Sequence, residues 1–171
     1  ELSSHPDVYP YIRYKAKTVD EFYFLTKQLI EAENNGELIS RTIIDEYEQP
    51  IGTINLYDIE NKSGFLATWV GRPYFGKGYN KLAKQLFLNE LFFCLDMEKI
   101  FMKVRKANVR SQKALAKLPF VVNGKELYPE VYNSINEKED IYELFVITKE
   151  HYSSYVHFAQ IANNNEEEVV S

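Results

Sequence analysis

The sequence predicts a mixed α/β fold, with helices on both faces of a mostly antiparallel sheet. Segments with helical periodicity alternate with β-branched segments in the order helix, three strands, helix, strand, helix, two strands. The composition, 45% hydrophobic and 26% charged over 171 residues, is that of a globular chain. This length fits one domain, over residues 1–161, better than two.

The first half of the chain predicts a helix and three strands. Thr18 and Glu21 have the spacing of a capping box, and apolar residues then recur at three and four positions, so a helix is expected from about Val19 to Asn34. Residues 38–47 and 51–59 favour a hairpin of two antiparallel strands. A third strand, residues 65–70, runs directly into a glycine-bearing loop over residues 71–78.

The second half begins with a long amphipathic segment, residues 79–96. Its apolar stripe includes Leu91 and Cys94, so we expect a helix in which the lone thiol is buried, while Lys81 and Lys84 lie largely elsewhere. The order is completed by four segments: a strand over residues 100–104, a helix over 108–118, and strands over 120–132 and 140–148.

The C-terminal segment shows a separate helical stripe. Tyr152, Tyr155, Val156 and Ala159 repeat at helical spacing, which suggests a helix that packs on a second subunit in a homodimer. The acidic, Asn- and Glu-rich residues 162–171 favour a disordered tail.

Charge and hydropathy narrow the choice of partners. The net charge of −5 and the pI of 5.3 argue against nucleic acid or an anionic membrane surface, and favour a cationic small molecule or a peptide amine. No signal peptide opens the chain, and no apolar run is long enough to cross a bilayer. A cytoplasmic protein is therefore expected.

The glycine loop is the segment that carries chemistry. Gly76 and Gly78 lie between a strand and a long helix, where glycine lets backbone N–H groups approach an anion and the helix adds partial positive charge. A phosphate site is the natural interpretation. A purely steric need for glycine at a strand-to-helix turn explains the pattern equally well.

A nucleotide-binding P-loop is a more remote alternative. Gly71, Gly76 and Lys77 have the spacing of the first seven positions of a Walker A motif. The eighth position is Gly78, which has no hydroxyl group to hold magnesium. The sequence therefore argues against this class.

The glycine loop, residues 71–79, is followed about thirty residues later by a second block, Asn108-Val-Arg-Ser111. Together the two blocks resemble the signature of the GNAT superfamily of N-acetyltransferases, closest to its RimJ/RimL-type branch. Ile51-Gly52 and the segment 116–120 extend the likeness. The resemblance implies a sheet split between two central strands, and a first strand and helix expected before residue 1.

The resemblance also implies a cofactor, acetyl-CoA, between the strands 65–70 and 100–104, and no metal. An amine would attack the thioester directly, and a backbone N–H beside Val70 would stabilise the developing oxyanion. Lys113 and Lys117 could meet the 3′-phosphate, although a solvated lysine face is an alternative. The implied cofactor-binding residues are Trp69, Val70, Gly71, Arg72, Phe75, Gly76, Lys77, Gly78, Tyr79, Asn108, Ser111 and Lys117.

By the same resemblance, Ser111 is expected to protonate the departing thiolate and Asn108 to hold the pantetheine. Simple capping of a helix is an alternative for both. Where relatives have a glutamate, this chain has Phe65 and Leu82. The nearest candidates for the base are therefore Asp58 and Glu60, with a water relay as an equal alternative.

The departures from the family pattern leave a second function open. A non-catalytic acyl-CoA-binding or sensor protein would not need the missing carboxylates. For an enzyme, the resemblance places residues 1–14 over the acceptor site, where tyrosines could form aromatic walls, unless they are simply part of a tyrosine-rich composition. These tyrosines are Tyr9, Tyr11, Tyr14, Tyr128 and Tyr132.

Overall fold

The computed structural model describes residues 2–170, with side chains through residue 161. These residues fall into two compact units, with the boundary between residues 97 and 98. Each unit combines helices with a three-stranded antiparallel sheet. The single domain expected over residues 1–161 stays a prediction.

The first unit is built on the predicted hairpin and the strand after it. In the sheet, β2 lies in the middle and pairs in antiparallel fashion with β1 and β3. Gly52 lies opposite Val70, so the end of β3 that leads into the glycine loop lies next to the start of β2. The strands are β1 (Leu38–Ile44), β2 (Pro50–Glu60) and β3 (Ser63–Val70).

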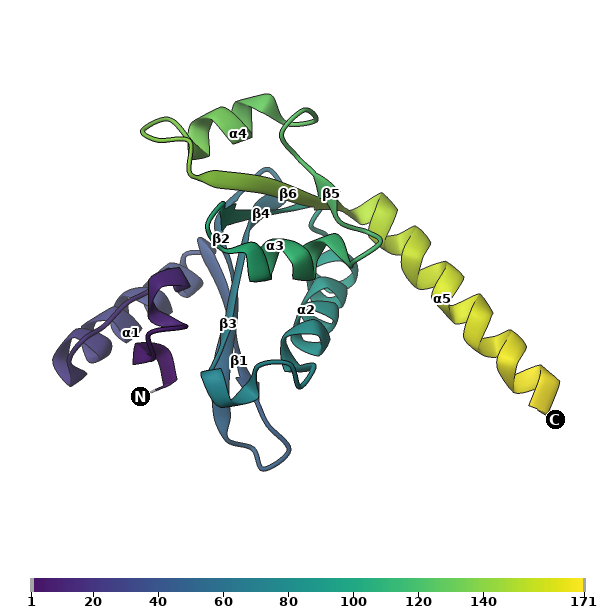
Figure 1. The fold of residues 1–171 in the computed structure, drawn as a ribbon, viewed down its shortest axis with the longest axis horizontal. Coiled ribbons are helices and arrows are strands. Elements are labelled where there is room, and N and C mark those ends of the chain that lie inside the picture. Colours follow the sequence, from purple (N-terminus) through teal and green to yellow (C-terminus); the bar gives the residue numbers. More distant parts are fainter. Residues whose placement is uncertain (1, 171) are drawn as a thin grey trace. The chain divides into compact units, whose positions relative to one another are not determined.

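Two helices lie on opposite sides of this sheet, α1 (Val19–Asn34) and α2 (Tyr79–Asn89) (Figure 1). We call the side toward α2 the α2 face; it carries Ile54 and, by strand alternation and register, Leu56, Leu66, Thr68 and Val70. The other side, the N-terminal face, carries Thr53, Asn55, Tyr57, Ala67 and Trp69. Three short 3₁₀ helices complete the unit, Leu2–Ser4, Tyr9–Tyr11 and Arg72–Tyr74.

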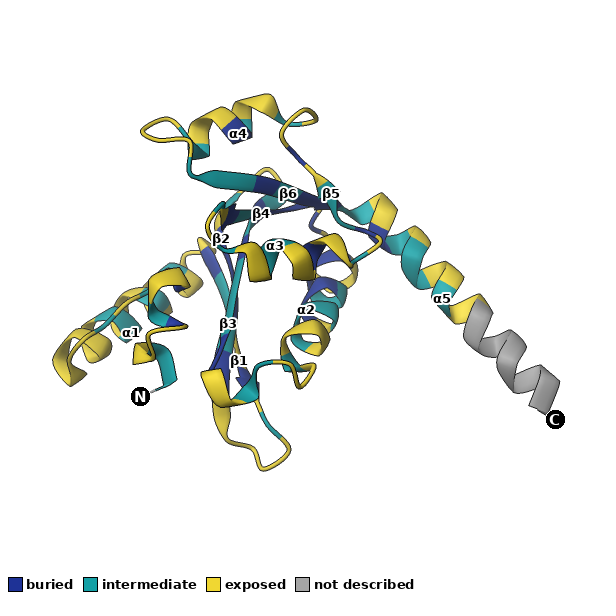
Figure 2. Cartoon of the chain, viewed as in Figure 1, coloured by how far each residue is buried: buried dark blue, intermediate teal, exposed yellow. Residues whose placement is uncertain are grey.

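The core of this unit lies between α2 and its sheet (Figure 2). Leu56 on β2 and Leu88 on α2 are fully buried. By contrast, α1 has no buried residue, and Phe22 and Phe24 are exposed. The strands and α2 therefore supply most of the apolar burial in this unit.

The bounds predicted for α1 are confirmed. Thr18 caps the helix, because its side chain accepts a hydrogen bond from the N–H of Glu21. The Glu21 carboxylate accepts one from the N–H of Lys17 at 2.6 Å. The two side chains thus satisfy donors at the helix start much as a capping box does.

Cys94 is exposed, so the predicted buried thiol is wrong. The α-helix ends at Asn89, and residues Glu90–Cys94 form a π-helical turn. A π turn holds more residues than an α turn, so the apolar stripe drifts around the axis. Leu91 and Phe92 stay buried, while Cys94 turns outward.

The second unit has its own antiparallel sheet, with β6 between β4 and β5. Its core includes Ile100 on β4 and Leu144 on β6, both fully buried. The strands are β4 (Lys99–Arg105), β5 (Val122–Asn123) and β6 (Tyr142–Thr148), and the helices are α3 (Val109–Ala116), α4 (Pro129–Ile135) and α5 (Lys149–Val170).

The strand predicted over residues 120–132 is mostly wrong. Only Val122–Asn123 pairs with β6, and α4 begins at Pro129. Proline has no N–H for a ladder but fits the first helical position, where that N–H is not needed. Tyr132, taken as the end of a strand, is a buried residue of α4.

The predicted C-terminal helix is present as α5. At its start, Tyr152 is fully buried and its ring packs edge-on against Phe120, with the centroids 5.0 Å apart. Phe158 and Ile161 are exposed. The disordered tail expected over 162–171 lies outside the residues whose side chains are described. Among the described residues we find no helix with both the length and the hydropathy of a membrane span.

Gly52 provides a test of the sheet. A methyl group there would lie 2.2 Å from the carbonyl oxygen of Trp69, a backbone atom that cannot rotate away. We expect Gly52→Ala to lower the free energy of unfolding by roughly 1–3 kcal/mol, because the strands must move apart. Denaturant unfolding measures this. Gly64→Ala, whose methyl group would meet only the Leu56 side chain, is the control and should cost less. Equal costs would contradict the prediction.

Candidate functional site

The glycine loop presents a row of free backbone donors. Gly76 and Gly78 have φ angles of 75° and 88°, in the left-handed region that favours glycine. Among the described residues, the N–H groups of Gly76, Lys77 and Gly78 have no hydrogen-bond partner, nor does that of Tyr79 at the first position of α2. The donors are therefore not used within the described fold.

The loop also has open space beside two of its glycines. An added methyl group at Gly76 or Gly78 would meet no atom within 4 Å. Gly71 differs, since a methyl group there would lie 2.9 Å from the Leu2 side chain, and its N–H donates to the carbonyl of Ile51 at 2.8 Å. Gly71 therefore closes the packing behind the loop, while Gly76 and Gly78 border open space.

The start of α2 adds positive potential to these donors. The helix has 11 residues, and its first turn holds no acidic side chain that would neutralise the dipole. Free N–H groups at the positive end of a helix form an anion site, of the kind that binds phosphates.

Two tyrosines hold this loop against the turn between β1 and β2. The Tyr79 hydroxyl donates to the Glu46 carboxylate, and the Tyr74 hydroxyl donates to Asp45 at 3.4 Å. Their rings meet edge-on, with the centroids 5.7 Å apart. The hydrogen bond to Glu46 raises the pKa of Tyr79 to about 12, because the carboxylate favours the protonated phenol.

The two cations of the loop differ in their contacts. The Arg72 Nε donates to Asp7 at 2.7 Å, and both side chains are about half exposed. The exposed Lys77 ammonium lies 5.4 Å from the centre of the Tyr74 ring. No ion pair of Lys77 is found in the described part of the chain. Lys77 is thus the loop cation that an incoming anion would meet first.

The strand before the loop contains a polar group that the sequence analysis missed. Thr68 lies one residue before Trp69, and its hydroxyl is buried without a hydrogen-bond partner in the described structure. By strand alternation it lies on the α2 face with Leu66 and Val70. The signal in the sequence is that Thr68 is polar although its neighbours on the same face of the strand, Leu66 and Val70, are apolar.

Lys84 is a second missed residue, because it does not lie on a freely solvated face of α2. It is half-buried by surface area, and its surroundings desolvate the ammonium enough to lower its pKa to about 8. Within the described residues it makes no hydrogen bond or ion pair. The sequence signal is a lysine four and seven residues before the buried Leu88 and Leu91, on their stripe.

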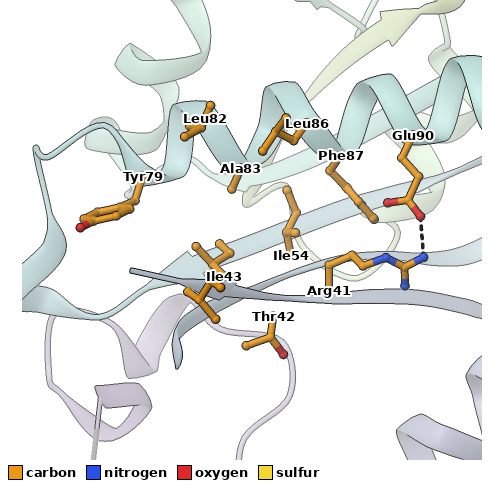
Figure 3. A pocket seen from close by; sticks show the side chains of 11 residues that line it. Arg41, Thr42, Ile43, Ile54, Tyr79, Leu82, Ala83, Leu86, Phe87 and Glu90 are labelled. Carbon is orange, nitrogen blue, oxygen red and sulfur yellow. Dashed lines mark hydrogen bonds and ion pairs between the residues drawn. The ribbon is translucent and has the colours of Figure 1, made fainter. Parts of the chain in front are cut away.

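An apolar pocket of about 310 Å³ lies on another side of α2, toward β1 and β2 (Figure 3). Leu82, Leu86 and Ile43 line it, and Tyr79 stands at one end. At the other end the charges are paired, since Arg41 donates to Glu90 at 2.5 Å. The pocket offers no free charge for an anion, so it does not extend the phosphate site.

The two carboxylates expected as bases are not brought to the loop. Asp58 is exposed and pairs with Arg13 at 3.4 Å, and Glu60 is exposed at the turn between β2 and β3. Because Gly52 pairs with Val70 at the other end, Glu60 lies about 25 Å along the strand from the loop end of the sheet. Their role as bases stays a prediction.

The remaining predicted residues lie in the second unit. Asn108 caps α3, since its side chain accepts from the N–H of Ser111 at 3.2 Å. The backbone N–H of Ser111 therefore has a partner. The Ser111 hydroxyl makes no hydrogen bond within the described residues. Lys113 and Lys117 are exposed, which suits both the contact with a 3′-phosphate and the solvated-face alternative, so the contact stays a prediction.

The tyrosines proposed as aromatic walls have different surroundings. Tyr11 is exposed, while Tyr9 and Tyr14 are half-buried. In the second unit, Tyr132 is buried, and its hydroxyl donates to Asp140 at 2.7 Å. The Tyr128 ring packs edge-on against Phe101 with centroids 5.2 Å apart.

The chain matches a protein-family model described as an acetyltransferase (GNAT) domain, over residues 1–121. None of the curated proteins matches it.

Solved structures of low sequence identity share the fold. A chimera of the spermidine N-acetyltransferase SpeG from Vibrio cholerae and hSSAT is similar with a TM-score of 0.68 and 16% identity, covering 88% of this chain and 87% of that one. Mycobacterium smegmatis RimJ in complex with CoA-disulfide gives 0.63 and 16%, covering 83% and 70%. The ribosomal-protein-S5-alanine acetyltransferase from Vibrio fischeri gives 0.64 and 18%, covering 86% and 82%. The predicted mixed α/β fold class is confirmed.

Glu46→Gln is expected to lower the pKa of Tyr79 from about 12 toward its ordinary value near 10, because the neutral amide removes the carboxylate that favours the protonated phenol. Near-ultraviolet absorbance titration measures this, with the Tyr79→Phe protein subtracted as background. Glu48→Gln, in the same turn, should leave the curve unchanged. A Tyr79 pKa equal in the wild type and in Glu46→Gln would show that the two side chains do not meet.

Proposed function

Because this chain belongs to the GNAT acetyltransferase family, we propose that it transfers the acetyl group of acetyl-CoA to a primary amine in a ternary complex. The enzyme class, an N-acetyltransferase, follows from the family. The cofactor contacts, the catalytic residues and the acceptor are the content of the proposal.

One observation carries the proposal: the unpaired N–H groups of residues 76–79 at the start of α2. Four donors at the positive end of a helix suit a diphosphate, which spreads its charge over several oxygens. The open space beside Gly76 and Gly78 lets those oxygens approach the backbone closely. Coenzyme A contains such a diphosphate, so the loop fits it.

The side chains of the loop favour coenzyme A over a magnesium nucleotide. Lys77 can add its charge to the phosphates, and Arg72 can do so if it leaves Asp7. A P-loop would need a hydroxyl for magnesium at the residue before the helix, and Gly78 has none. Trp69 and Val70, at the end of β3, are proposed to bind the pantetheine arm.

Acetyl-CoA supplies an acetyl group activated as a thioester, and a C–N bond replaces the C–S bond. Attack needs an uncharged amine, so one proton must leave the ammonium of the acceptor before the reaction. The attacking nitrogen loses a second proton as the amide forms, and the departing sulfur gains one. Ser111 is proposed as the proton donor, since its hydroxyl is not engaged within the described residues and its N–H is already capped by Asn108.

The acceptor is proposed to be a cationic amine. The net charge of −5 gives the protein an attraction for cations. The structural neighbours are named for spermidine and for the alanine of ribosomal protein S5, so a polyamine and a protein N-terminus represent two classes to compare. Asp58 and Glu60 remain proposed bases for its proton.

Calorimetric titration with coenzyme A and with ATP-magnesium tests the cofactor, and thiol release from acetyl-CoA over a panel of amines tests the enzyme. The panel is spermidine, an alanine-initiated peptide, a free amino acid and an aminoglycoside. We expect coenzyme A alone to bind and one class of amine to stimulate thiol release. Binding without release above background would indicate a sensor, and binding of ATP-magnesium alone would indicate a P-loop.

Gly78→Ala is expected to weaken coenzyme A binding about tenfold. The added methyl group makes the φ of 88° unfavourable by about 1–2 kcal/mol, so the loop relaxes and the donors lose their alignment. Gly36→Ala is the matched control, since Gly36 also has a positive φ of 74° and open space around it but lies outside the loop. The Gly36→Ala protein should lose a similar free energy of unfolding and bind coenzyme A as tightly as the wild type does. Equal affinities of the two variants would argue against the loop as the diphosphate site.

Ser111→Ala is expected to lower kcat by about a hundredfold while the Tm and the KM for acetyl-CoA stay nearly unchanged, because only a proton donor is removed. Steady-state kinetics and thermal melting measure both effects. Asn108→Ala is the contrasting variant, since loss of the cap should cost about 1 kcal/mol of stability. A kcat unchanged in Ser111→Ala would exclude Ser111 as the acid.

A further inference from the structure

Lys84 lies on a buried side of α2. It is two residues from Leu82 and from Leu86, which line the apolar pocket (Figure 3), so it lies about 200° around the helix from each. Leu88 and Leu91, four and seven residues later, are fully buried. Lys84 therefore shares their face and is held away from the pocket.

The ammonium of Lys84 has no compensating charge in the described structure. Desolvation is the one cause that lowers its pKa, with no hydrogen bond and no charged neighbour contributing. On the pocket side of α2, Arg41 is already paired with Glu33 and Glu90. A half-buried cation without a partner is unfavourable, and a bound anion would relieve that unfavourable free energy.

The helix geometry directs this charge toward the glycine loop. Lys84 is five residues after Tyr79, a rise of about 7.5 Å. Side chains of a helix lean toward its N-terminus, so the lysine stem covers the turn around Asn80. The lysine stem therefore runs toward the end of α2 at which the N–H groups of residues 76–79 are free.

We propose that Lys84 supplies a half-buried positive charge to the diphosphate bound at the start of α2. The backbone amides hold the phosphate oxygens, and the ammonium neutralises them from the helix side. The surface residue Lys77 adds a screened charge, whereas the half-buried Lys84 adds one that is screened less. This inference rests on the proposed function, and it adds a cofactor-binding residue outside the loop.

Lys84→Met tests the charge while keeping an unbranched stem of similar length. We expect coenzyme A and ADP to bind about ten- to a hundredfold more weakly, because a hydrogen bond to a charged group is lost. Pantetheine, which lacks the diphosphate, should bind as in the wild type. Lys84→Arg should restore most of the affinity. Lys81→Met, at an exposed lysine on the same helix, is the matched control and should bind all three as the wild type does.

The pH dependence of ADP binding gives a second readout. Below pH 8 the free protein carries a charged Lys84, and binding needs no proton. As the pH rises through about 8, Lys84 loses its proton in the free protein and must regain one on binding, so the wild-type affinity falls. The phosphates of ADP are already fully ionised in this range. Lys84→Arg and Lys84→Met should show no such fall.

The outcomes separate this inference from the proposed function. If the wild type binds neither coenzyme A nor ADP, the proposed function and the role of Lys84 are both overturned. If the wild type binds and Lys84→Met binds equally well, only the role of Lys84 is overturned. A loss of pantetheine binding as large as the loss of ADP binding would also overturn it, because the variant would then act on the fold instead of on the diphosphate.

Discussion

The site depends on one backbone constraint, the reversal of the chain from β3 into α2. At this reversal Gly76 and Gly78 adopt left-handed conformations, and the backbone donors around them have no partner among the described residues. A residue with a side chain in either position would be strained, although each has open space around it. Glycine is therefore required by conformation here, and the unpaired donors are its result.

Much of the fold could be predicted because local signals decided it. The capping residues Thr18 and Glu21 fixed the first helix, and alternation fixed the hairpin and β3. Two failures had local causes as well. The prediction of a strand over residues 120–132 did not take into account Pro129, which begins a helix. The prediction of a buried Cys94 thiol required a regular α-helix, whereas the structure has a π turn there. Periodicity alone does not reveal a change of helical pitch.

The site was predictable only in part. Glycine spacing identified the loop, because the chemistry lies in the backbone. Thr68 and Lys84 were missed, since their importance comes from what surrounds them in space. A lysine on a helix is normally solvated, and the burial of this one depends on packing that spacing does not encode. Asp58 and Glu60 were selected as the nearest carboxylates on the neighbouring strand, and the register of β2 places that end of the strand away from the loop, so their role as bases stays a prediction.

The tyrosine contacts to the β1–β2 turn have a consequence for affinity. Loops rich in glycine normally lose much conformational entropy when they close on a ligand. Here Tyr79 and Tyr74 anchor both sides of the glycines to Glu46 and Asp45 before any ligand arrives. The folded chain has thus already restricted the loop, and this preorganisation leaves more of the interaction free energy available for binding.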